Sequence, residues 1–229
     1  MRVDVVSGEA AGLVAASGRH LTTGDHEAAR RFSHDGARRL WLASRALQRA
    51  LGAHLLGVAP EDVVIERRCA HCGDDSHGKP SLPGVDYSVS HSGSLVALAW
   101  TTSGRVGLDL EAGQRLGDAA GVAEHLAAEG EIPDLSPEQR QRAVLRLWAR
   151  KEAVVKLTGH GMTVPLTGIR ADRDLVSVEP RPAGWPDAAV WVRDLDLEPG
   201  YFAALATSPE IAEVSARRIS APSRIAFRR

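Results

Sequence analysis

Two carboxylates at alternate positions, Asp109 and Glu111, are the first side chains of this sequence whose types and spacing could do chemistry. A β-strand over the segment GLDLE would place both carboxylates on one face and Leu108 and Leu110 on the other, toward the core. Two adjacent carboxylates repel each other unless water or a cation lies between them. Taken alone, the pair is more typical of a solvated strand end, so it indicates a cation site only if a further ligand joins it.

The segment from Trp148 to Lys156 supplies a candidate third ligand, Glu152. Trp148, Glu152 and Lys156 recur at every fourth residue, and this spacing predicts that they share one face of a helix. On an exposed helix Glu152 and Lys156 would be an ordinary surface pair worth about 0.3 kcal/mol. If Glu152 instead meets Asp109 and Glu111, the three carboxylates suit Mg²⁺, or Mn²⁺, which favours the same ligands. Such a cation also takes substrate phosphate oxygens, which indicates phosphate chemistry.

Two shorter segments carry groups that suit a phosphorylated ligand. Gly78 allows a close approach of the backbone, Pro80 stiffens the turn, and Lys79 supplies a positive charge for phosphate. Ser90 and His91 bring a hydroxyl and an imidazole to the end of a predicted strand. Each group is commonplace by itself, and the value of these residues lies in their order along the chain.

The elements that must position these residues are two long helices and a series of short strands. We expect a helix over residues 25–56, with an interruption near 33–36, and a second helix from Ser136, whose capping box with Gln139 marks its start, to Gly159. A third helix is expected over 117–129, and strands at 3–6, 63–66, 85–90, 95–101, 106–110, 176–178, 190–192 and 201–207, with another around Ile169.

A weak internal repeat suggests that the chain has two related halves. The sequence LVALAW at 95–100 resembles FAALAT at 202–207, and each is a strand of small residues late in its half of the chain. Two similar α+β lobes would explain the repeat, although alanine-rich strands also resemble one another by chance. We expect the boundary near residues 103–106, which gives an N-terminal lobe of residues 1–104 and a C-terminal lobe of residues 105–229.

Composition narrows the class of protein. Hydrophobic residues make up 44% and charged residues 25% of the 229 residues, which is typical of a globular protein with an apolar core. The formal net charge of −1 gives no basic field for nucleic acid or a membrane surface. No segment approaches the roughly 20 apolar residues of a membrane span. Asp4 and Glu9 interrupt the N-terminus where a signal peptide would be apolar, so we expect a cytoplasmic protein.

Cys69 and Cys72 form a Cys-x-x-Cys pair in a predicted loop. Two cysteines are too few for a disulfide scaffold in a chain of this length. A structural zinc ion takes four protein ligands, and His71 or His77 would have to complete the set. We expect a reduced pair in a surface loop, with a zinc site as a less favoured alternative and a redox role as a weaker one.

The succession of four motifs, HGKP at 77–80, YSVSHSG at 87–93, VGLDLE at 106–111 and LWARKEAVVKLTGHGM at 147–162, resembles the 4′-phosphopantetheinyl transferases. The likeness is to the long, monomeric, surfactin-synthetase-activating type and spans residues 25–165 in order and spacing. The resemblance implies an α+β fold with two similar lobes in a pseudo-twofold arrangement. Each lobe would be a small sheet packed against helices, with the active site in the cleft between the lobes.

The resemblance also implies roles for individual residues. Mg²⁺ would be bound by Asp109, Glu111 and Glu152, and Lys156 would contact the pyrophosphate of coenzyme A and stabilise the departing phosphate. Lys79, with Gly78 and Pro80, would lie beside the adenine and phosphates, and Ser90 and His91 would contact phosphates, including the 3′-phosphate. Arg38 would contact the nucleotide, Lys151 would steady the metal ligands, and Trp148 would pack.

The implied reaction is that of a holo-[acyl-carrier-protein] synthase. A serine hydroxyl of an apo carrier protein attacks the β-phosphorus of coenzyme A, receives phosphopantetheine and displaces adenosine 3′,5′-bisphosphate. The serine proton would go to a base, either a water held at the metal or a glutamate between the second and third family motifs. Glu129 and Glu131 both lie near that position, and Glu131 is slightly favoured.

One departure and one alternative remain open. Family members often have basic residues just before the first long helix to hold the 3′-phosphate, whereas this chain has Asp25, His26, Arg30 and Arg31 there. The alternative function is a non-catalytic coenzyme A or nucleotide-binding module. Such a module would keep Lys79 and His91 but would not need three carboxylates, so the transferase is favoured.

Overall fold

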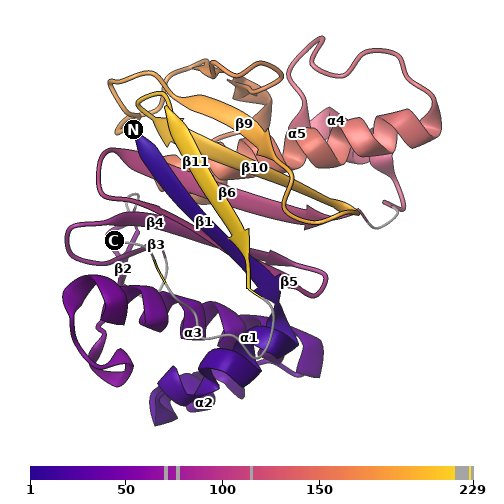
Figure 1. Ribbon diagram of the computed structural model, residues 1–229. Coiled ribbons are helices and arrows are strands. Elements are labelled where there is room, and N and C mark those ends of the chain that lie inside the picture. The colour runs from indigo at the N-terminus through magenta and orange to yellow at the C-terminus, as the bar shows by residue number, and fades with distance from the viewer. Residues whose placement is uncertain (70–71, 76–77, 114–115, 220–226, 228–229) are drawn as a thin grey trace.

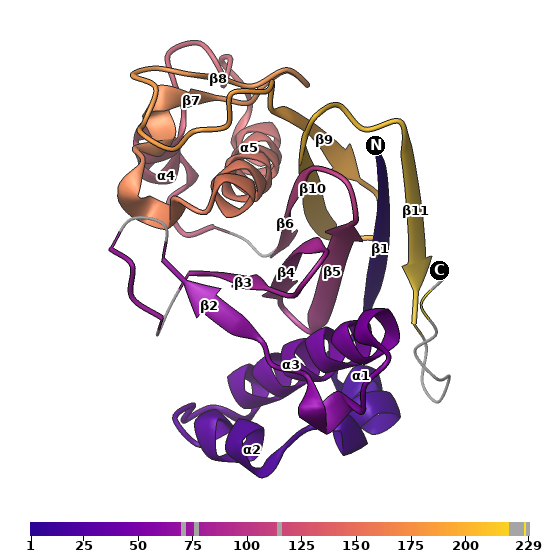
Figure 2. The ribbon, with the colours of Figure 1, turned by 90° about the vertical axis from the view of Figure 1, so that its left-hand side faces the viewer.

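Two small β-sheets pack against each other, and helices cover their outer faces (Figures 1 and 2). This computed structural model describes residues 1–69, 72–75, 78–113, 116–219 and 227. The first sheet has the order β11 (Glu213–Arg218), β1 (Arg2–Glu9), β5 (Leu95–Thr101) and β4 (Asp86–Ser92). The second sheet has the order β6 (Arg105–Ala112), β10 (Tyr201–Ser208) and β9 (Trp191–Leu195). The predicted α+β class is therefore confirmed.

The helices and the smaller strand pairs complete the fold. The helices are α1 (Ala10–Ser17), α2 (Thr23–Ala29), α3 (Asp35–Leu56), α4 (Ala119–Leu126) and α5 (Pro137–Thr158). Two short ladders join β2 (Glu66–Arg68) to β3 (Lys79–Ser81) and β7 (Ile169–Arg170) to β8 (Ser177–Val178). Among the described residues, no helix combines the length and apolarity that crossing a membrane requires.

The two main sheets repeat one topology. The chain runs β1, α3, β4 and β5 in the first, then β6, α5, β9 and β10 in the second. In each series the last strand lies between the other two and pairs antiparallel with both: β5 with β1 and β4, and β10 with β6 and β9. The resembling segments 95–100 and 202–207 lie in β5 and β10, the two central strands, so the internal repeat of the sequence corresponds to a repeat of the fold.

Alternation along β5 shows how the layers are joined. Leu95, Ala97 and Ala99 face the second sheet, while the residues between them face α1 and α3. Every residue of β5 is buried because both faces of the strand are covered. A third apolar cluster lies between the second sheet and α5. The molecule thus has three apolar layers, and the middle one belongs to both sheets.

Capping signals set the ends of the two long helices as predicted. Ser136 and Gln139 form the expected capping box of α5, and Gly159 ends that helix with φ of 78°. Gly57 ends α3 in the same left-handed conformation, with φ of 69°. The helix predicted from residue 25 is interrupted as expected and forms two helices, α2 and α3.

Three elements were not predicted: strand β3, which lies outside every expected strand, helix α1 and strand β11. Helix α1 has no side-chain cap and the uncharged sequence AAGLVAAS, so neither caps nor amphipathic spacing mark it. Strand β11 is an edge strand with the polar sequence EVSARR, and its pairing partner is the distant β1. Although β11 follows residue 105, it belongs to the sheet of the first half. The division into lobes of residues 1–104 and 105–229 stays a prediction.

Candidate active site

The site is built on two neighbouring strands, β4 and β6, joined by side chains of β4. Asp86 Oδ1 accepts from Val106 N at 2.8 Å, and Ser88 Oγ accepts from Leu108 N at 2.9 Å. Farther along, Ser92 Oγ accepts from Ala112 N at 3.0 Å. These residues lie on one face of β4, since alternate residues of a strand point the same way. The serine and aspartate side chains therefore fix the register of the carboxylate strand against the Ser90–His91 strand.

Gly107 brings helix α5 unusually close to β6. A Cβ atom on this glycine would lie 2.0 Å from the carbonyl oxygen of Ala153 and 2.5 Å from the backbone nitrogen of Leu157. Asp109 and Glu111 share the strand face of Gly107, and Leu108 and Leu110 are buried between the sheets, as predicted. The missing side chain at position 107 thus lets α5 present its last turns to the two carboxylates.

Asp109, Ser90 and Lys156 form the centre of the site. Lys156 Nζ donates to Asp109 Oδ1 at 2.5 Å and to Ser90 Oγ at 2.9 Å, and Ser90 Oγ donates to the same Asp109 oxygen at 2.9 Å. Ser92 Oγ donates to Glu111 Oε2 at 3.1 Å. Residues of β4, β6 and α5, far apart in the sequence, therefore meet at one carboxylate.

The carboxylates fit a divalent cation, although they do not enclose one as they stand. In the described part of the chain, no group of three or more His, Cys, Asp and Glu side chains is arranged to hold a metal ion. Asp109 Oδ2, however, is buried and has no hydrogen-bond partner among the residues that the structure describes. Burial and the charge of Asp109 raise the pKa values of both Glu111 and Glu152. An unpartnered buried oxygen beside two carboxylates that resist ionisation is the arrangement that a bound cation stabilises.

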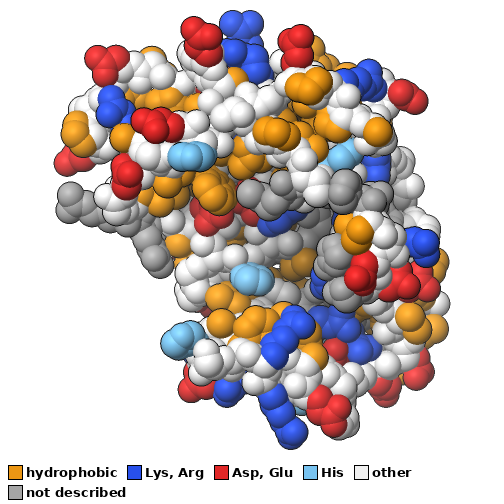
Figure 3. Space-filling model, turned by 180° about the vertical axis from the view of Figure 1, so that it is seen from behind, with side chains coloured by type: hydrophobic (Ala, Val, Ile, Leu, Met, Phe, Trp, Pro, Cys, Tyr) orange, Lys and Arg blue, Asp and Glu red, His pale blue; other side chains and the backbone are white. Residues whose placement is uncertain are grey.

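Two cavities meet at Lys156. The larger, about 520 Å³, is lined by residues of α3, by Ser90 and His91 of β4, and by three arginines, Arg31, Arg45 and Arg67, of which only Arg45 belongs to α3. The smaller, about 390 Å³, is lined by Gly78, Lys79 and the loop that follows α5. Arg67, Val89 and Lys156 line both. Figure 3 shows a hollow across this side of the molecule, with Lys and Arg side chains along it. We call the cavity of about 520 Å³ the cation cavity, because the cationic side chains of Arg31, Arg45 and Arg67 line it.

The sequence matches two family models in succession. The model described as 4′-phosphopantetheinyl transferase, N-terminal, matches residues 13–103, and the model of the 4′-phosphopantetheinyl transferase superfamily matches residues 105–188. The chain belongs to the 4′-phosphopantetheinyl transferase superfamily.

Curated relatives agree with this assignment. The 4′-phosphopantetheinyl transferase HetI of a Nostoc species is 30% identical over 151 residues, which cover 62% of this chain and 61% of HetI. The Bacillus subtilis transferase ffp is 27% identical over 197 residues, 82% of each chain. The transferase Sfp of Bacillus subtilis strain 168 is 27% identical over 143 residues, 58% of this chain and 60% of Sfp. The superfamily is one of transferase enzymes.

Several predicted transferase residues do line the cavities. Ser90, His91 and Lys156 line the cation cavity, and Gly78, Lys79 and Lys156 line the smaller one. Glu152 is half-buried, one turn of α5 before Lys156. Pro80 is in neither lining and pairs with Arg67 in the β2–β3 ladder. His77, the first residue of the HGKP motif, lies outside the described residues.

Glu131 and Lys151 require a correction to their predicted roles. Both side chains have 0% exposure, and Lys151 Nζ donates to Glu131 Oε2 and to the carbonyl oxygens of Leu126 and Leu166. Glu131 Oε1 in turn accepts from Ala171 N at 2.7 Å. Without exposed surface, Glu131 is not placed to take a proton from a carrier serine. Lys151 Nζ has three N–H groups, and its bonds go to Glu131 and two backbone carbonyls rather than to the predicted metal ligands. The pair ties α5 to the loops on either side of it.

Glu129, the other candidate base, is exposed, and its backbone carbonyl accepts from Arg170 at 2.8 Å. Its catalytic role stays a prediction.

Lys79 and Gly78 serve the protein's own chain in this structure. Lys79 Nζ donates to Asp86 Oδ1 at 2.5 Å and to Val106 O at 2.8 Å. Lys79 therefore links β4, which contains Asp86, to β6, which contains Val106. Burial lowers the pKa of Lys79, and the charge of Asp86 opposes this shift. A Cβ on Gly78 would lie 2.5 Å from Arg68 O, so the close approach expected of this glycine is to backbone rather than to a ligand.

Arg38 was expected to contact the nucleotide, and this role stays a prediction. Arg38 donates to Asp35 Oδ1 at 2.8 Å and to Phe32 O at 3.0 Å, and it lines neither cavity. Arg31, Arg45 and Arg67 line the cation cavity instead. They come from the α2–α3 connection, α3 and β2, so no local motif could identify them.

The cysteine pair lies at the wall of the smaller cavity. Cys69 is half-buried, Cys72 is exposed, and both line the cavity together with Gly78 and Lys79. The predicted surface loop is consistent with these positions. Because His71 and His77 lie outside the described residues, the zinc alternative stays untested.

Proposed function

We propose that this protein transfers the 4′-phosphopantetheine group of coenzyme A to a serine of an apo carrier protein and releases adenosine 3′,5′-bisphosphate. The observation that carries the proposal is the position of Lys156, which bonds to Asp109 and lines both cavities. Coenzyme A carries a phosphomonoester and a pyrophosphate, so a site that binds it needs positively charged side chains at two separate places. The two cavities that meet at Lys156 offer two such places. Family membership supports the same reaction.

The chemical step follows from these residues. The serine oxygen of the carrier protein forms a bond to the β-phosphorus, and the bond from this phosphorus to the oxygen bridging to adenosine 3′,5′-bisphosphate breaks. The serine proton goes to a base, for which the exposed Glu129 is the candidate that this chain offers. Lys156 stabilises the charge that develops on the leaving phosphate, and Arg31, Arg45, Arg67 and His91 bind the nucleotide phosphates. Because the nucleophile belongs to the carrier protein, this chain needs none.

Asp109, Glu111 and Glu152 would hold Mg²⁺, with Mn²⁺ as a substitute. When bound there, the cation neutralises charge on the pyrophosphate. Asp109 has a second task in the apoprotein, where its Oδ1 orients both Ser90 and Lys156.

We further propose that the protein works as a cytoplasmic monomer of two lobes, residues 1–104 and 105–229, on carrier proteins, without nucleic acid or membrane partners. The near-neutral net charge of −1 is consistent with this set of partners.

Intact-protein mass spectrometry of an apo carrier protein tests the proposal. Incubation with the enzyme, coenzyme A and Mg²⁺ should add one phosphopantetheine group, and EDTA, Asp109→Asn or Lys156→Met should each abolish the gain. Ser81→Ala, at an exposed position in neither cavity, is the matched control and should leave transfer intact. No gain with fatty acid, polyketide and peptide carriers, despite binding of coenzyme A, would favour the non-catalytic binding module.

A further inference from the structure

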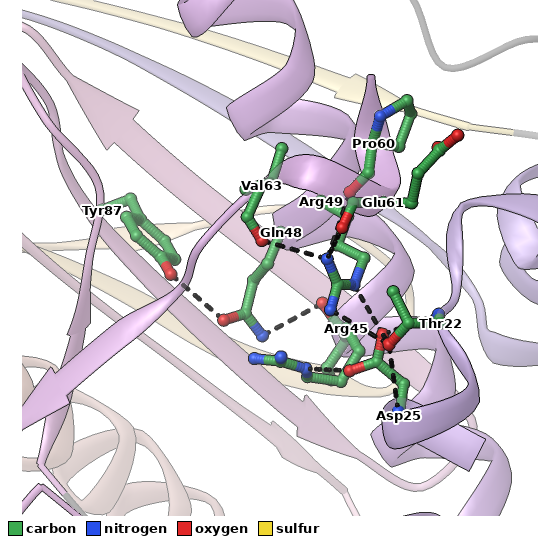
Figure 4. Close-up of polar contacts among 10 residues, drawn as sticks. Thr22, Asp25, Arg45, Gln48, Arg49, Pro60, Glu61, Val63 and Tyr87 are labelled. Atoms are coloured by element: carbon green, nitrogen blue, oxygen red, sulfur yellow. Dashed lines mark hydrogen bonds and ion pairs between the residues drawn. The ribbon is translucent and has the colours of Figure 1, made fainter. Parts of the chain in front are cut away.

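The buried carboxylate of Asp25 divides its two oxygens between two arginines of α3 (Figure 4). Its side chain is only 4% exposed. Oδ2 accepts from the backbone nitrogen and hydroxyl of Thr22, both at 3.0 Å, and from Arg49 Nε at 2.5 Å. Oδ1 accepts from Arg45 Nε at 3.0 Å. One oxygen is therefore tied to the start of α2 and to Arg49, and the other faces Arg45 alone.

Arg49 makes hydrogen bonds inside the protein with all three nitrogens of its guanidinium. Its Nη1 donates to the carbonyl oxygens of Pro60 at 3.1 Å, Glu61 at 3.3 Å and Val63 at 3.0 Å, and its Nη2 donates to Thr22 Oγ1 at 3.3 Å. Figure 4 shows these bonds converging on a single guanidinium. Arg49 anchors α3 to the segment that follows it, and its side chain is only 8% exposed.

Arg45 is held in a different way. Within the described part of the chain its one hydrogen bond is the Nε bond to Asp25, although its side chain is only 16% exposed. Its guanidinium carbon lies 5.8 Å from the centre of the Trp41 ring, and both residues line the cation cavity. The two Nη groups of Arg45 are not bonded to the described residues and are not among the buried unpartnered atoms, so they reach the open space of the cavity, where a bound anion can accept from them.

The charges around Arg45 point to the same ligand chemistry. Arg31 and Arg67 line the cavity with it, and the Arg31 guanidinium carbon lies 5.4 Å from the Trp41 ring. Burial lowers the pKa of Arg67, and the positive charges of Arg45 and Arg31 lower it further. Cations that repel one another in a shared cavity bind a phosphate more strongly than they would as separate surface groups.

We propose that Asp25 is a positioning residue, whose Oδ1 holds Arg45 Nε so that both Nη groups of Arg45 face the cation cavity and bind a phosphate of coenzyme A. This inference rests on the proposed function. It also explains why an acidic residue stands where the family resemblance leads one to expect a basic one. Asp25 contacts no ligand and instead turns an arginine of the neighbouring helix toward it.

Asp25→Asn separates the two tasks of the carboxylate. The asparagine carbonyl oxygen can replace Oδ2, which has three donors to satisfy, but its amide group then faces Arg45 Nε, a donor against a donor. Thr22→Ala is the matched control, because it removes the helix cap, the hydroxyl bond to Oδ2 and the acceptor of Arg49 Nη2, while it leaves the backbone bond to Oδ2 and the bond between Oδ1 and Arg45. Both variants should lose stability, and only Asp25→Asn should disturb Arg45.

Calorimetric titration of the folded variants with coenzyme A measures the effect. We expect Asp25→Asn to raise the Kd for coenzyme A by about tenfold, because it disturbs a charged hydrogen bond between Arg45 and the phosphate. Thr22→Ala leaves Arg45 in place and should change the Kd by less than about twofold. Arg45→Ala should weaken binding at least as much as Asp25→Asn does, and Asp25→Asn should add nothing in the Arg45→Ala background. In steady-state assays the KM for coenzyme A should rise in Asp25→Asn with little change in kcat.

A parallel titration with 3′-dephospho-coenzyme A identifies the phosphate. If Asp25→Asn no longer matters there, Arg45 binds the 3′-phosphate, and if the effect persists, Arg45 binds the pyrophosphate. Equal weakening by Thr22→Ala, or additive effects of Asp25→Asn and Arg45→Ala, would overturn the positioning role. Failure of the wild-type protein to bind coenzyme A would overturn the proposed function itself, and the positioning role with it.

Discussion

Glu131 and Lys151 show at the scale of single residues how burial decides between a catalytic and a structural role. Glu131→Gln leaves the buried Lys151 charge without its partner, which should lower the free energy of unfolding by about 3–5 kcal/mol. Urea unfolding measures this loss, and Glu129→Gln, at an exposed site, should show almost none.

The same variant tests the assignment of the base. Loss of a general base costs about a hundredfold or more in rate. Folded Glu131→Gln protein, assayed well below its melting temperature, should keep kcat within about threefold and retain the pH profile of the wild type. A hundredfold loss with an altered pH profile would restore Glu131 as the catalytic base.

Asp25 should make the stability of the protein sensitive to acid. Burial raises the pKa of Asp25, but the hydrogen bond from Arg49, the bond from the Thr22 backbone and the charge of Arg45 outweigh it and lower the pKa from 3.8 to about 2. A lowered pKa stabilises the fold at pH values above the unfolded pKa, and this contribution is lost as the pH falls toward 2. We expect the stability difference between wild type and Asp25→Asn to narrow by roughly 2 kcal/mol between pH 5 and pH 2. A difference that stays constant in urea unfolding over this range would show that the charge of Asp25 is not what stabilises the cluster.

At the scale of elements, the contact between β6 and α5 depends on Gly107. Gly107→Ala would place a methyl group 2.0 Å from the Ala153 carbonyl oxygen, so helix and strand must separate. Displacing Glu152 and Lys156 from Asp109 by about 1 Å should lower kcat by up to a hundredfold. Gly36→Ala is the control, because nothing lies within 4 Å of a Cβ there. Carrier-loading rates that match in the two variants would contradict this account of the site.

Side chains of β4 accept hydrogen bonds from the backbone N–H groups of β6, and we expect them to stabilise the fold as backbone carbonyls do in a sheet. Ser88 is buried, and its hydroxyl accepts from Leu108 N at 2.9 Å and donates to Leu108 O at 3.4 Å. Ser88→Ala leaves a buried N–H without a partner, which costs about 1–3 kcal/mol. Thermal unfolding of Ser88→Ala and of the exposed Ser81→Ala measures the difference, and equal melting temperatures would mean that water replaces the hydroxyl.

The sequence predicted those parts of the site that local patterns determine. Alternation put Asp109 and Glu111 on one face of a strand, and a capping box and a glycine fixed the ends of α5. The cation cavity could not be predicted, because Arg45 and Arg67 reach it only when α3 and β2 pack together. Glu131 was favoured as the catalytic base because its position near the motifs does not reveal whether its side chain is exposed to water or, as in the structure, paired with the buried Lys151.

At the scale of the whole molecule, the middle apolar layer makes the two halves depend on each other. Val3, Val5 and Leu95 of the first sheet pack with Leu108 and Leu205 of the second, and β11 crosses back to pair with β1. Cutting the chain at residue 104 would expose the apolar face of each sheet and remove β11 from the first. Neither half would then bury enough apolar surface to offset its conformational entropy.

We therefore expect one cooperative unfolding transition for the whole chain, with calorimetric and van't Hoff enthalpies that agree. Fragments 1–104 and 105–229 should each show little ordered structure by circular dichroism and no slow hydrogen exchange in β5 or β10. Two separate transitions, or a folded fragment, would mean that the lobes are independent domains. If the lobes were independent domains, a bound ligand would have to hold the two lobes together. Coenzyme A should then raise the melting temperatures of the two lobes by different amounts. Under a single transition, coenzyme A should raise one melting temperature, because the cation cavity needs α3 and β4 of the first half and Lys156 of the second.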